Sequence, residues 1–244
     1  MKPSGFCPIK TPIKSVLQHA VESDIIESNC MADISIGSKA VYRVNPLTEE
    51  EAALLLEVAK QHKNGLYYPP LLCALRTGMR LGEIQALEWD DVDFDNRRIS
   101  VRKSQYRGKV TSTKNKKIRQ ADMSPQLAET LRRLRLERKK LALREGKALP
   151  SFVFADEKGR MLSQENLRSN LNLCLKRAGL RPIRIHDLRH TYATIRLLKG
   201  HNIGDVSYQL GHSSISITYN VYGHWTPGNF KAEVDELDVQ FQVK

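Results

Sequence analysis

Several features are missing from this sequence of 244 residues, and each absence excludes a class of protein. No apolar run approaches the roughly 20 residues that a membrane span requires, and no signal-peptide core stands at the start. The four cysteines form no C-x-x-C pair, which argues against a disulfide framework and a cysteine zinc knuckle. No internal repeat or low-complexity tract is present. The sequence therefore predicts a cytoplasmic globular protein with reduced cysteines and no membrane partner.

Acidic residues are scarce relative to basic ones. The chain has 39 Lys and Arg against 27 Asp and Glu, a net charge of +12, and residues 97–119 hold ten basic side chains and no acid. Such a stretch suits the phosphates of a nucleic acid. A solubilising face with no specific ligand is the alternative, and charge alone does not distinguish the two.

Helix caps and breakers divide the chain into a short leading segment and one main domain. Residues 13–26 carry apolar side chains at helical intervals, and a polar passage to Pro46 follows, which predicts a terminal helix and a linker. Thr48 can form a capping box with Glu51, and the main domain is predicted to begin there.

The main domain is predicted to be α+β, mostly helical with one small antiparallel sheet. Strand-like stretches at 98–103, 109–113 and 117–121 predict the sheet, which would be basic. Caps and breakers predict the helices. The first opens at Thr48 and carries an apolar stripe from Ala52 to Ala59, and the others cover residues 69–77, 82–89, 124–145, 163–178, 186–199, 204–210 and a last segment through Tyr219. Arg80 then lies in a turn between two helices.

Four separated clusters contain side chains that are able to take part in catalysis or ligand binding. They are T-G-M-R-L-G-E at 77–83, T-K-N-K at 113–116, H-D-L-R-H at 186–190 and L-G-H-S-S-I-S-I-T-Y-N-V-Y-G-H at 210–224. Each cluster alone has an ordinary structural interpretation. Arg80 suits the end of a helix, and Lys114 is one of several lysines in a basic hairpin.

The third cluster places three side chains on one helix face. His186, Arg189 and His190 stand at i, i+3 and i+4 near the positive end of the predicted helix, where an anion is attracted. The rival interpretation is a two-histidine metal site of the H-E-x-x-H kind. Asp187 replaces the glutamate and no clear third ligand follows, so no metal is predicted.

Together the clusters contain the parts for cleaving a phosphodiester through a covalent intermediate. Two arginines can neutralise the non-bridging oxygens of a pentacoordinate phosphorus, and histidines can donate further hydrogen bonds to them. A tyrosine can serve as nucleophile once cations stabilise its anion. A lysine can protonate the departing 5′-oxygen, so the scheme requires no metal or other cofactor.

In this order the clusters resemble the tyrosine recombinases, the phage-integrase family of site-specific DNA recombinases, over residues 46–226. The motifs T-G-x-R-x-G-E, T-K-x-K, H-x-x-R and L-G-H-S-S followed by Y-x-H are jointly a specific signature. Carried over by position, the resemblance implies the catalytic residues Arg80, Lys114, His186, Arg189 and His212, with Glu83 as supporting acid and Tyr222 as nucleophile. Tyr219 lies outside the Y-x-H context and is not expected to take that role.

The resemblance also implies a reaction and partners. One DNA strand is cleaved to a 3′-phosphotyrosyl link and a free 5′-hydroxyl, exchanged and rejoined without a cofactor. The implied partner is double-stranded DNA in the bacterial cytoplasm, with a homotetramer formed on DNA from monomers and with excision or host architectural proteins. The basic side chains expected to contact DNA are Arg97, Arg98, Arg102, Lys103, Arg107, Lys109, Lys116, Lys117 and Arg119.

The front of the chain departs from the family pattern. Members usually clamp DNA between the catalytic domain and a preceding core-binding domain, for which only residues 1–45 are available here. We expect these residues to be the last helix and linker of such a domain, residues 227–244 to dock on a neighbouring subunit, and the chain to be a fragment of a longer integrase. Two alternatives stay open, a DNA-binding module without catalysis and a type IB topoisomerase.

Overall fold

The computed structural model of the chain describes residues 7–32, 44–106, 108–112, 118–156 and 158–225. The chain separates into two units, Met1–Arg43 and Val44–Lys244. In the first unit, helix α1 covers Cys7–Glu22. It ends before the predicted end at residue 26 because Asp24 takes a left-handed φ of 53°, which a right-handed helix does not contain. The assignment of this unit to a core-binding domain stays a prediction.

The second unit opens with the predicted capping box. The Thr48 hydroxyl accepts a hydrogen bond from the Glu51 backbone N–H at 3.2 Å, and Glu51 Oε2 accepts one from the Thr48 N–H at 2.9 Å. An N-cap side chain of this kind stabilises a helix by about 1 kcal/mol. The helix that follows, α2 (Glu49–Gln61), buries one stripe of side chains, namely Ala52, Leu55, Leu56 and Ala59.

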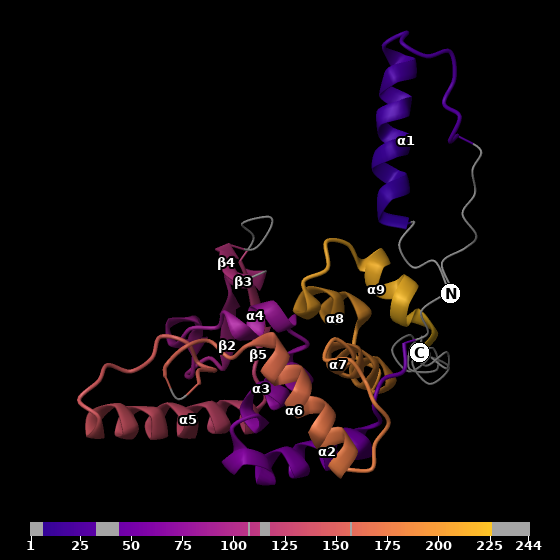
Figure 1. Ribbon diagram of the computed structural model, residues 1–244. Coiled ribbons are helices and arrows are strands. Elements are labelled where there is room, and N and C mark those ends of the chain that lie inside the picture. The colour runs from indigo at the N-terminus through magenta and orange to yellow at the C-terminus, as the bar shows by residue number, and fades with distance from the viewer. Residues whose placement is uncertain (1–6, 33–43, 107, 113–117, 157, 226–244) are drawn as a thin grey trace, which may run out of the picture. The chain divides into compact units, whose positions relative to one another are not determined.

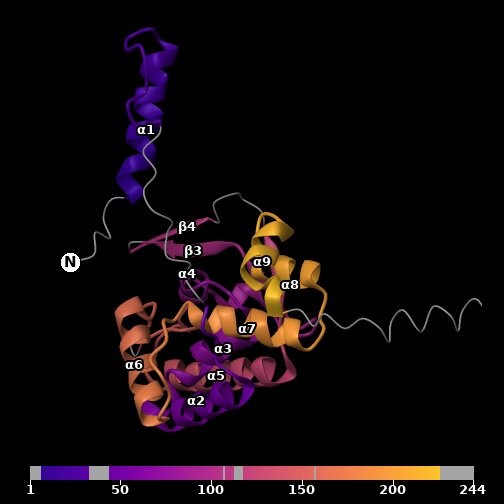
Figure 2. The same cartoon turned by 90° about the vertical axis from the view of Figure 1, so that its right-hand side faces the viewer.

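Helix α3 (Tyr68–Thr77) is the central helix of the second unit. All of its residues except Tyr68 and Arg76 are buried. It packs against α2, α5 (Pro125–Arg144) and α7 (Asp187–Leu198), while α6 (Gln164–Arg177) packs on α2 (Figures 1 and 2). Its prolines at the first positions and its left-handed end at Gly78 agree with the predicted bounds.

The strands form two antiparallel sheets: β1 (Val92–Asp93), β2 (Arg98–Val101) and β5 (Arg119–Asp122) in that order, and a hairpin of β3 (Lys103–Tyr106) and β4 (Lys109–Ser112). The predicted small antiparallel sheet is present, but the hairpin strands form a separate two-stranded sheet and do not join it. Strand β2 buries Ile99 and Val101 in the core, whereas β3 fully buries none of its side chains. The chain leaves the core at Arg102, and the hairpin projects from the unit in Figure 1.

The helix predicted over residues 82–89 is also shorter than expected. Helix α4 covers only Leu81–Gln85, and a separate 3₁₀ turn, η2, covers Trp89–Asp91. Between them, Glu88 is extended and pairs with Phe152 in an isolated bridge, and the Trp89 N–H donates to the Ser151 carbonyl at 3.1 Å. A contact with a distant segment thus overrides the local helical pattern.

Two short helices complete the described chain. Helices α8 (Ile203–Leu210) and α9 (Ile215–Tyr222) pack against each other and against α7 (Figure 2). Between these helices lies a second, smaller apolar core that contains Tyr192, Leu197, Val206, Leu210 and Tyr222. Helix α9 runs through Tyr219 and ends at Tyr222, so both tyrosines lie on the same helix, as predicted.

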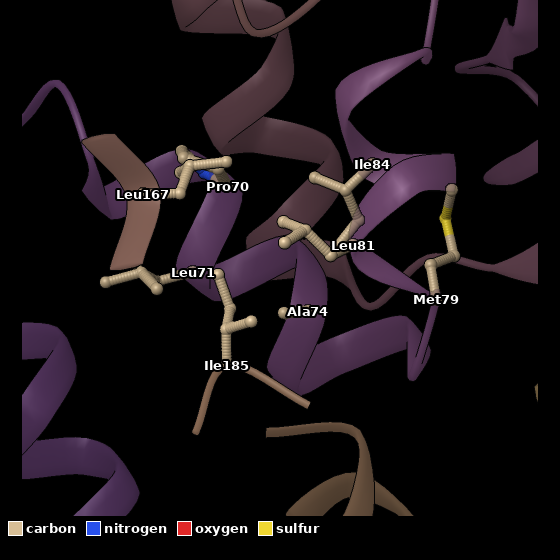
Figure 3. A pocket seen from close by; sticks show the side chains of 8 residues that line it. All are labelled: Pro70, Leu71, Ala74, Met79, Leu81, Ile84, Leu167 and Ile185. Atoms are coloured by element: carbon tan, nitrogen blue, oxygen red, sulfur yellow. The ribbon is translucent and has the colours of Figure 1, made fainter. Parts of the chain in front are cut away.

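Figure 3 shows a small space in the larger core, beside the turn that carries Arg80. Its volume is about 10 Å³ and only apolar side chains line it, among them Met79 and Leu81. A space of this size and polarity cannot hold a ligand. The space shows that Met79 and Leu81, the two sequence neighbours of Arg80, pack in the core and so fix the backbone of the turn.

The structure gives information on two features discussed from the sequence, membrane-spanning segments and cysteine pairs. No helix in the described part of the chain is both long enough and apolar enough to cross a bilayer. Cys73 and Cys174 are buried free thiols, and Cys30 is an exposed one.

Candidate active site

The turn between α3 and α4 brings Arg80 into the site. Gly78 has φ 62°, and a Cβ there would lie 2.4 Å from Cδ1 of Tyr192 on α7. The carbonyl of Gly78 accepts a hydrogen bond from Arg189 Nη1 at 2.7 Å. Only glycine allows α7 to approach this closely, and the approach sets two arginines from distant segments side by side.

Glu83 holds the guanidinium of Arg80. Its side chain is 3 % exposed, and Arg80 Nη1 donates to its Oε1 at 3.0 Å. Arg119 donates to both carboxylate oxygens, at 2.9 and 2.7 Å. Burial raises the pKa of Glu83, but hydrogen bonds and charge from the two arginines outweigh it and hold the pKa below its ordinary value. Glu83 therefore stays ionised and fixes both arginines.

Arg119 was expected on the DNA-binding surface, and the structure places it inside. Its side chain is 11 % exposed, bound to Glu83 and, through Nε, to the Gln209 carbonyl at 3.2 Å. A Cβ on Gly211 would lie 2.6 Å from Arg119 Cδ. The guanidinium thus joins β5 to the end of α8 and is not available to a phosphate on the surface.

Arg189 is a buried cation. It is 3 % exposed, and none of the described carboxylates forms an ion pair with it. Burial, and then the charge of Arg80, lower its pKa. A buried charge of this kind is costly, and an anion beside it would offset that cost. Arg189 and Arg80 are therefore suited to bind a phosphate together.

His186 and His212 border the same cations. His186 is at the start of α7, and partial burial together with Arg189 lowers its pKa. His212 Nδ1 lies 2.7 Å from Thr218 Oγ1, and burial, followed by the charges of Arg189 and Arg80, lowers its pKa to about 4. His212 follows Gly211, whose carbonyl accepts from Arg80 Nη2 at 3.3 Å. Both rings are thus neutral near pH 7.

Tyr222 faces this cluster from the end of α9. It is 1 % exposed, and its Oη lies 2.6 Å from His190 Nδ1. Burial raises the pKa of the Tyr222 phenol to about 12, although the charge of Arg189 acts in the opposite direction. Tyr219, one turn earlier, is 65 % exposed. The geometry therefore favours Tyr222 over Tyr219 as the nucleophile.

The family resemblance assigns no catalytic role to His190. Its position at i+4 from His186 indicated the correct helix face, but its contact with Tyr222 joins residues 32 positions apart. A pattern of neighbouring residues cannot predict a side-chain contact between positions so far apart in the sequence.

The stretch 97–119 contains no acidic residue, but acidic residues from other parts of the chain contact it. Arg98, Arg102 and Lys103 pair with acids from other segments, at 3.7 Å, 3.3 Å and 2.7 Å. Arg97 and Lys109 are exposed. Four predicted residues, including the candidate general acid, lie outside the described residues: Arg107, Lys114, Lys116 and Lys117.

Known proteins with similar sequences belong to one family. The model of the phage integrase family matches residues 45–228. A XerC-like tyrosine recombinase of Caldanaerobacter subterraneus is 28 % identical, over 94 % of this chain and 64 % of that protein. The ICEBs1 integrase of Bacillus subtilis is 26 % identical, again over 94 % and 64 %. The chain spans less than two thirds of the length of these relatives.

Solved structures show the same fold. The Tn1549 transposon integrase in complex with transposon right end DNA has a TM-score of 0.75 and 22 % identity, covering 95 % of this chain and 77 % of that chain. The catalytic domain of the bacteriophage HP1 integrase has a TM-score of 0.58 and 22 % identity, covering 83 % and 100 %. The predicted α+β fold, mostly helical, is confirmed. Because the family model spans most of the sequence, from the start of the second unit to beyond Tyr222, the chain belongs to the phage integrase family.

Proposed function

We propose that the chain is the catalytic domain of a tyrosine-type site-specific DNA recombinase. It cleaves one strand of duplex DNA, forms a 3′-phosphotyrosyl link and rejoins the strand to a new partner. The observation that carries this proposal is the placement of Arg189, a buried cation whose charge acts on both the Tyr222 phenol and the His212 ring. Such a site provides charge where a phosphorane develops it.

In the proposed reaction, the scissile phosphate binds between the two arginines. Arg80 and Arg189 neutralise the non-bridging oxygens, and His186 and His212 donate further hydrogen bonds. Tyr222 attacks phosphorus and the 5′-oxygen leaves. Because Tyr222 is 1 % exposed, its surroundings must open when DNA binds.

The departing 5′-oxygen requires a proton. We assign its delivery to Lys114, on the strength of its place in T-K-N-K. The charges of neighbouring lysines disfavour the ammonium form, which makes a lysine a better proton donor.

The partners and the outer segments belong to the same proposal. The substrate is duplex DNA, as in the solved complex of the Tn1549 transposon integrase, reached in the cytoplasm and bound by a homotetramer that assembles from monomers. Excision or host architectural proteins assist. Residues 1–45 are the end of a core-binding domain and its linker, and residues 227–244 dock on a neighbouring subunit.

A nicked suicide substrate tests the proposal. The nick lets the 5′-hydroxyl fragment diffuse away, so the protein stays covalently attached to DNA. Since the target sequence is unknown, the probe is a pool of nicked duplexes of randomised sequence, with sequencing of the protein-linked strands. We expect an adduct that survives denaturation, is absent in Tyr222→Phe and persists in Tyr219→Phe.

Each other outcome has a definite meaning. An adduct that persists in Tyr222→Phe but disappears in Tyr219→Phe would reverse the nucleophile assignment. Binding without any adduct would favour a DNA-binding module. Relaxation of a supercoiled plasmid that lacks any selected site would favour a type IB topoisomerase.

A further inference from the structure

His190 forms a hydrogen bond with the hydroxyl of Tyr222, the proposed nucleophile. Nδ1 and Oη are 2.6 Å apart, the ring centroids are 5.5 Å apart, and the rings are tilted by 53°. The partners come from different helices, α7 and α9. The packing of the smaller core holds these helices together in the free protein.

The position of His190 relates it to the phosphate site. It follows Arg189 directly, and its ring lies edge-on to His186, with centroids 4.9 Å apart. The same helical turn therefore presents two phosphate ligands and a nitrogen in contact with the nucleophile. If the hydrogen bond served only to satisfy a buried phenol, its partner could come from any element and would not need to lie on the helical turn that carries the phosphate ligands.

We propose that His190 is the general base that accepts the Tyr222 proton during strand cleavage. This inference rests on the proposed recombinase function. As the Oη–P bond forms, the O–H bond breaks and the proton passes to Nδ1, giving an imidazolium. The P–O bond to the 5′-oxygen breaks, and that oxygen takes a proton from the general acid. In rejoining, the 5′-hydroxyl attacks phosphorus and gives its proton to the deprotonated general acid, while the P–Oη bond breaks and the imidazolium returns the proton to Oη.

The acid–base properties of the two groups agree with transfer during attack. Burial, followed by the neighbouring His186, lowers the pKa of His190 to about 4, so the ring is neutral and able to accept. With the pKa of the Tyr222 phenol raised to about 12, no proton moves in the resting protein. The phenol becomes strongly acidic only as its oxygen bonds to phosphorus, and a base already in hydrogen-bond contact then takes the proton.

His190→Asn separates proton transfer from positioning. The asparagine Oδ1 lies near the place of Nδ1 and accepts a hydrogen bond, but it does not take up a proton near neutral pH. With the selected nicked duplex, we expect the rate of adduct formation to fall by about 10² to 10⁴-fold while DNA binding is unchanged. His201→Asn, three residues beyond the end of α7, serves as the matched control and should react at the wild-type rate.

A more acidic nucleophile provides the decisive readout. Trifluorotyrosine at position 222 has a phenol several pKa units more acidic than that of tyrosine in the same surroundings, so it depends far less on a base. The defect of His190→Asn should nearly vanish in this background, whereas a bridging 5′-sulfur, which removes the need for the general acid, should not rescue it. An equal defect with tyrosine and trifluorotyrosine, or no defect at all, would overturn the proposal. No adduct with the wild-type chain would instead overturn the recombinase function.

The contact itself is testable in the folded wild-type chain. In ¹⁵N NMR of the imidazole, we expect His190 Nδ1 to be an unprotonated acceptor whose resonance moves in Tyr222→Phe. A protonated Nδ1 in the free protein would exclude it as the base, even if His190→Asn failed to fold.

Discussion

His190 and His212 are kept neutral by their surroundings, and this has a consequence for stability. Burial and neighbouring charges lower the pKa of both rings to about 4. A histidine in the unfolded chain has a pKa of about 6.5, so below that pH the unfolded chain binds protons that the folded chain does not. The free energy of unfolding should be greatest above pH 6.5 and fall by on the order of a few kcal/mol as the pH approaches 4.

Urea unfolding at pH 7 and at pH 5 measures this effect. The carboxyl of Glu83, with its lowered pKa, loses its contribution only at still lower pH, so this window reports mainly the histidines. His212→Asn, which does not titrate, should flatten the dependence. Equal stability of the wild-type chain at both pH values would contradict the low pKa values.

Lys114 has a chemical signature of its own if it is the general acid. A sulfur in place of the bridging 5′-oxygen leaves as a thiolate that needs no proton. Lys114→Ala should therefore cleave ordinary DNA about 10² to 10⁴-fold more slowly and the sulfur-bridged substrate at nearly the wild-type rate. Arg80→Ala should be rescued far less, since it loses charge stabilisation. Rescue in Lys116→Ala instead would move the role to that residue.

The residues of the site differ in how far the sequence predicts them. Arg80, Glu83 and His186 stand in motifs, so the family resemblance predicts them as site residues, and the structure brings them together. Arg119 was assigned to the surface because the sequence records its basic neighbours and not the carboxylate of Glu83, 36 positions away, which holds it. Its burial follows from a pairing through space that no spacing rule reports.

At the scale of elements, the turn after α3 provides a matched pair of substitutions. Gly78 and Gly146 have nearly the same left-handed φ, 62° and 64°, but a Cβ meets Tyr192 at the first position and nothing at the second. Gly146→Ala should cost about 1 to 2 kcal/mol, the strain of a left-handed residue. Gly78→Ala adds a clash with α7 and should cost several kcal/mol, measured by urea unfolding.

The two variants also differ in their expected effect on chemistry. Displacement of α7 by Gly78→Ala moves Arg189 away from Arg80, so DNA cleavage should be lost even where the variant is folded. Gly146→Ala should cleave normally. If both variants were equally stable and active, the close contact of the turn with α7 would not matter to the site.

Element bounds were predictable where short-range chemistry decides them. The capping box at Thr48 and the left-handed Gly78 involve residues within one helical turn, and both ends were correct. The division of the strands into two sheets and the interruption after Gln85 depend on packing against the core and on Phe152. Such partners are distant in sequence, so local periodicity could not reveal them.

At the scale of the whole molecule, the positive charge divides into a surface part and an interior part. Lys109 and Arg98 are exposed, whereas Arg119 is held by Glu83. Each phosphate contact contributes about −0.9 to the slope of log K against log salt. Binding of a random-sequence duplex should weaken steeply with salt, and Lys109→Ala should reduce the slope by about 1 with stability unchanged.

Arg119→Ala is the interior counterpart. It leaves the buried Glu83 carboxylate with one partner and should lower the free energy of unfolding by about 3 to 5 kcal/mol. The salt slope of the folded variant should stay at the wild-type value, measured by fluorescence anisotropy. A reduced slope with unchanged stability would return Arg119 to the DNA-contacting surface.

The hydrogen bonds of the arginines determine when the site can exist at all. Arg80 reaches the Gly211 carbonyl across 131 positions, and Arg189 reaches the Gly78 carbonyl across 111. Synthesis proceeds from the N-terminus at about 5 to 20 residues per second, so the first arginine leaves the ribosome many seconds before the segments that orient it. A partly synthesised chain has basic strands that attract DNA but has neither the oriented arginines nor the tyrosine. In the proposed reaction, a nascent chain that lacks these segments is therefore unable to cleave DNA.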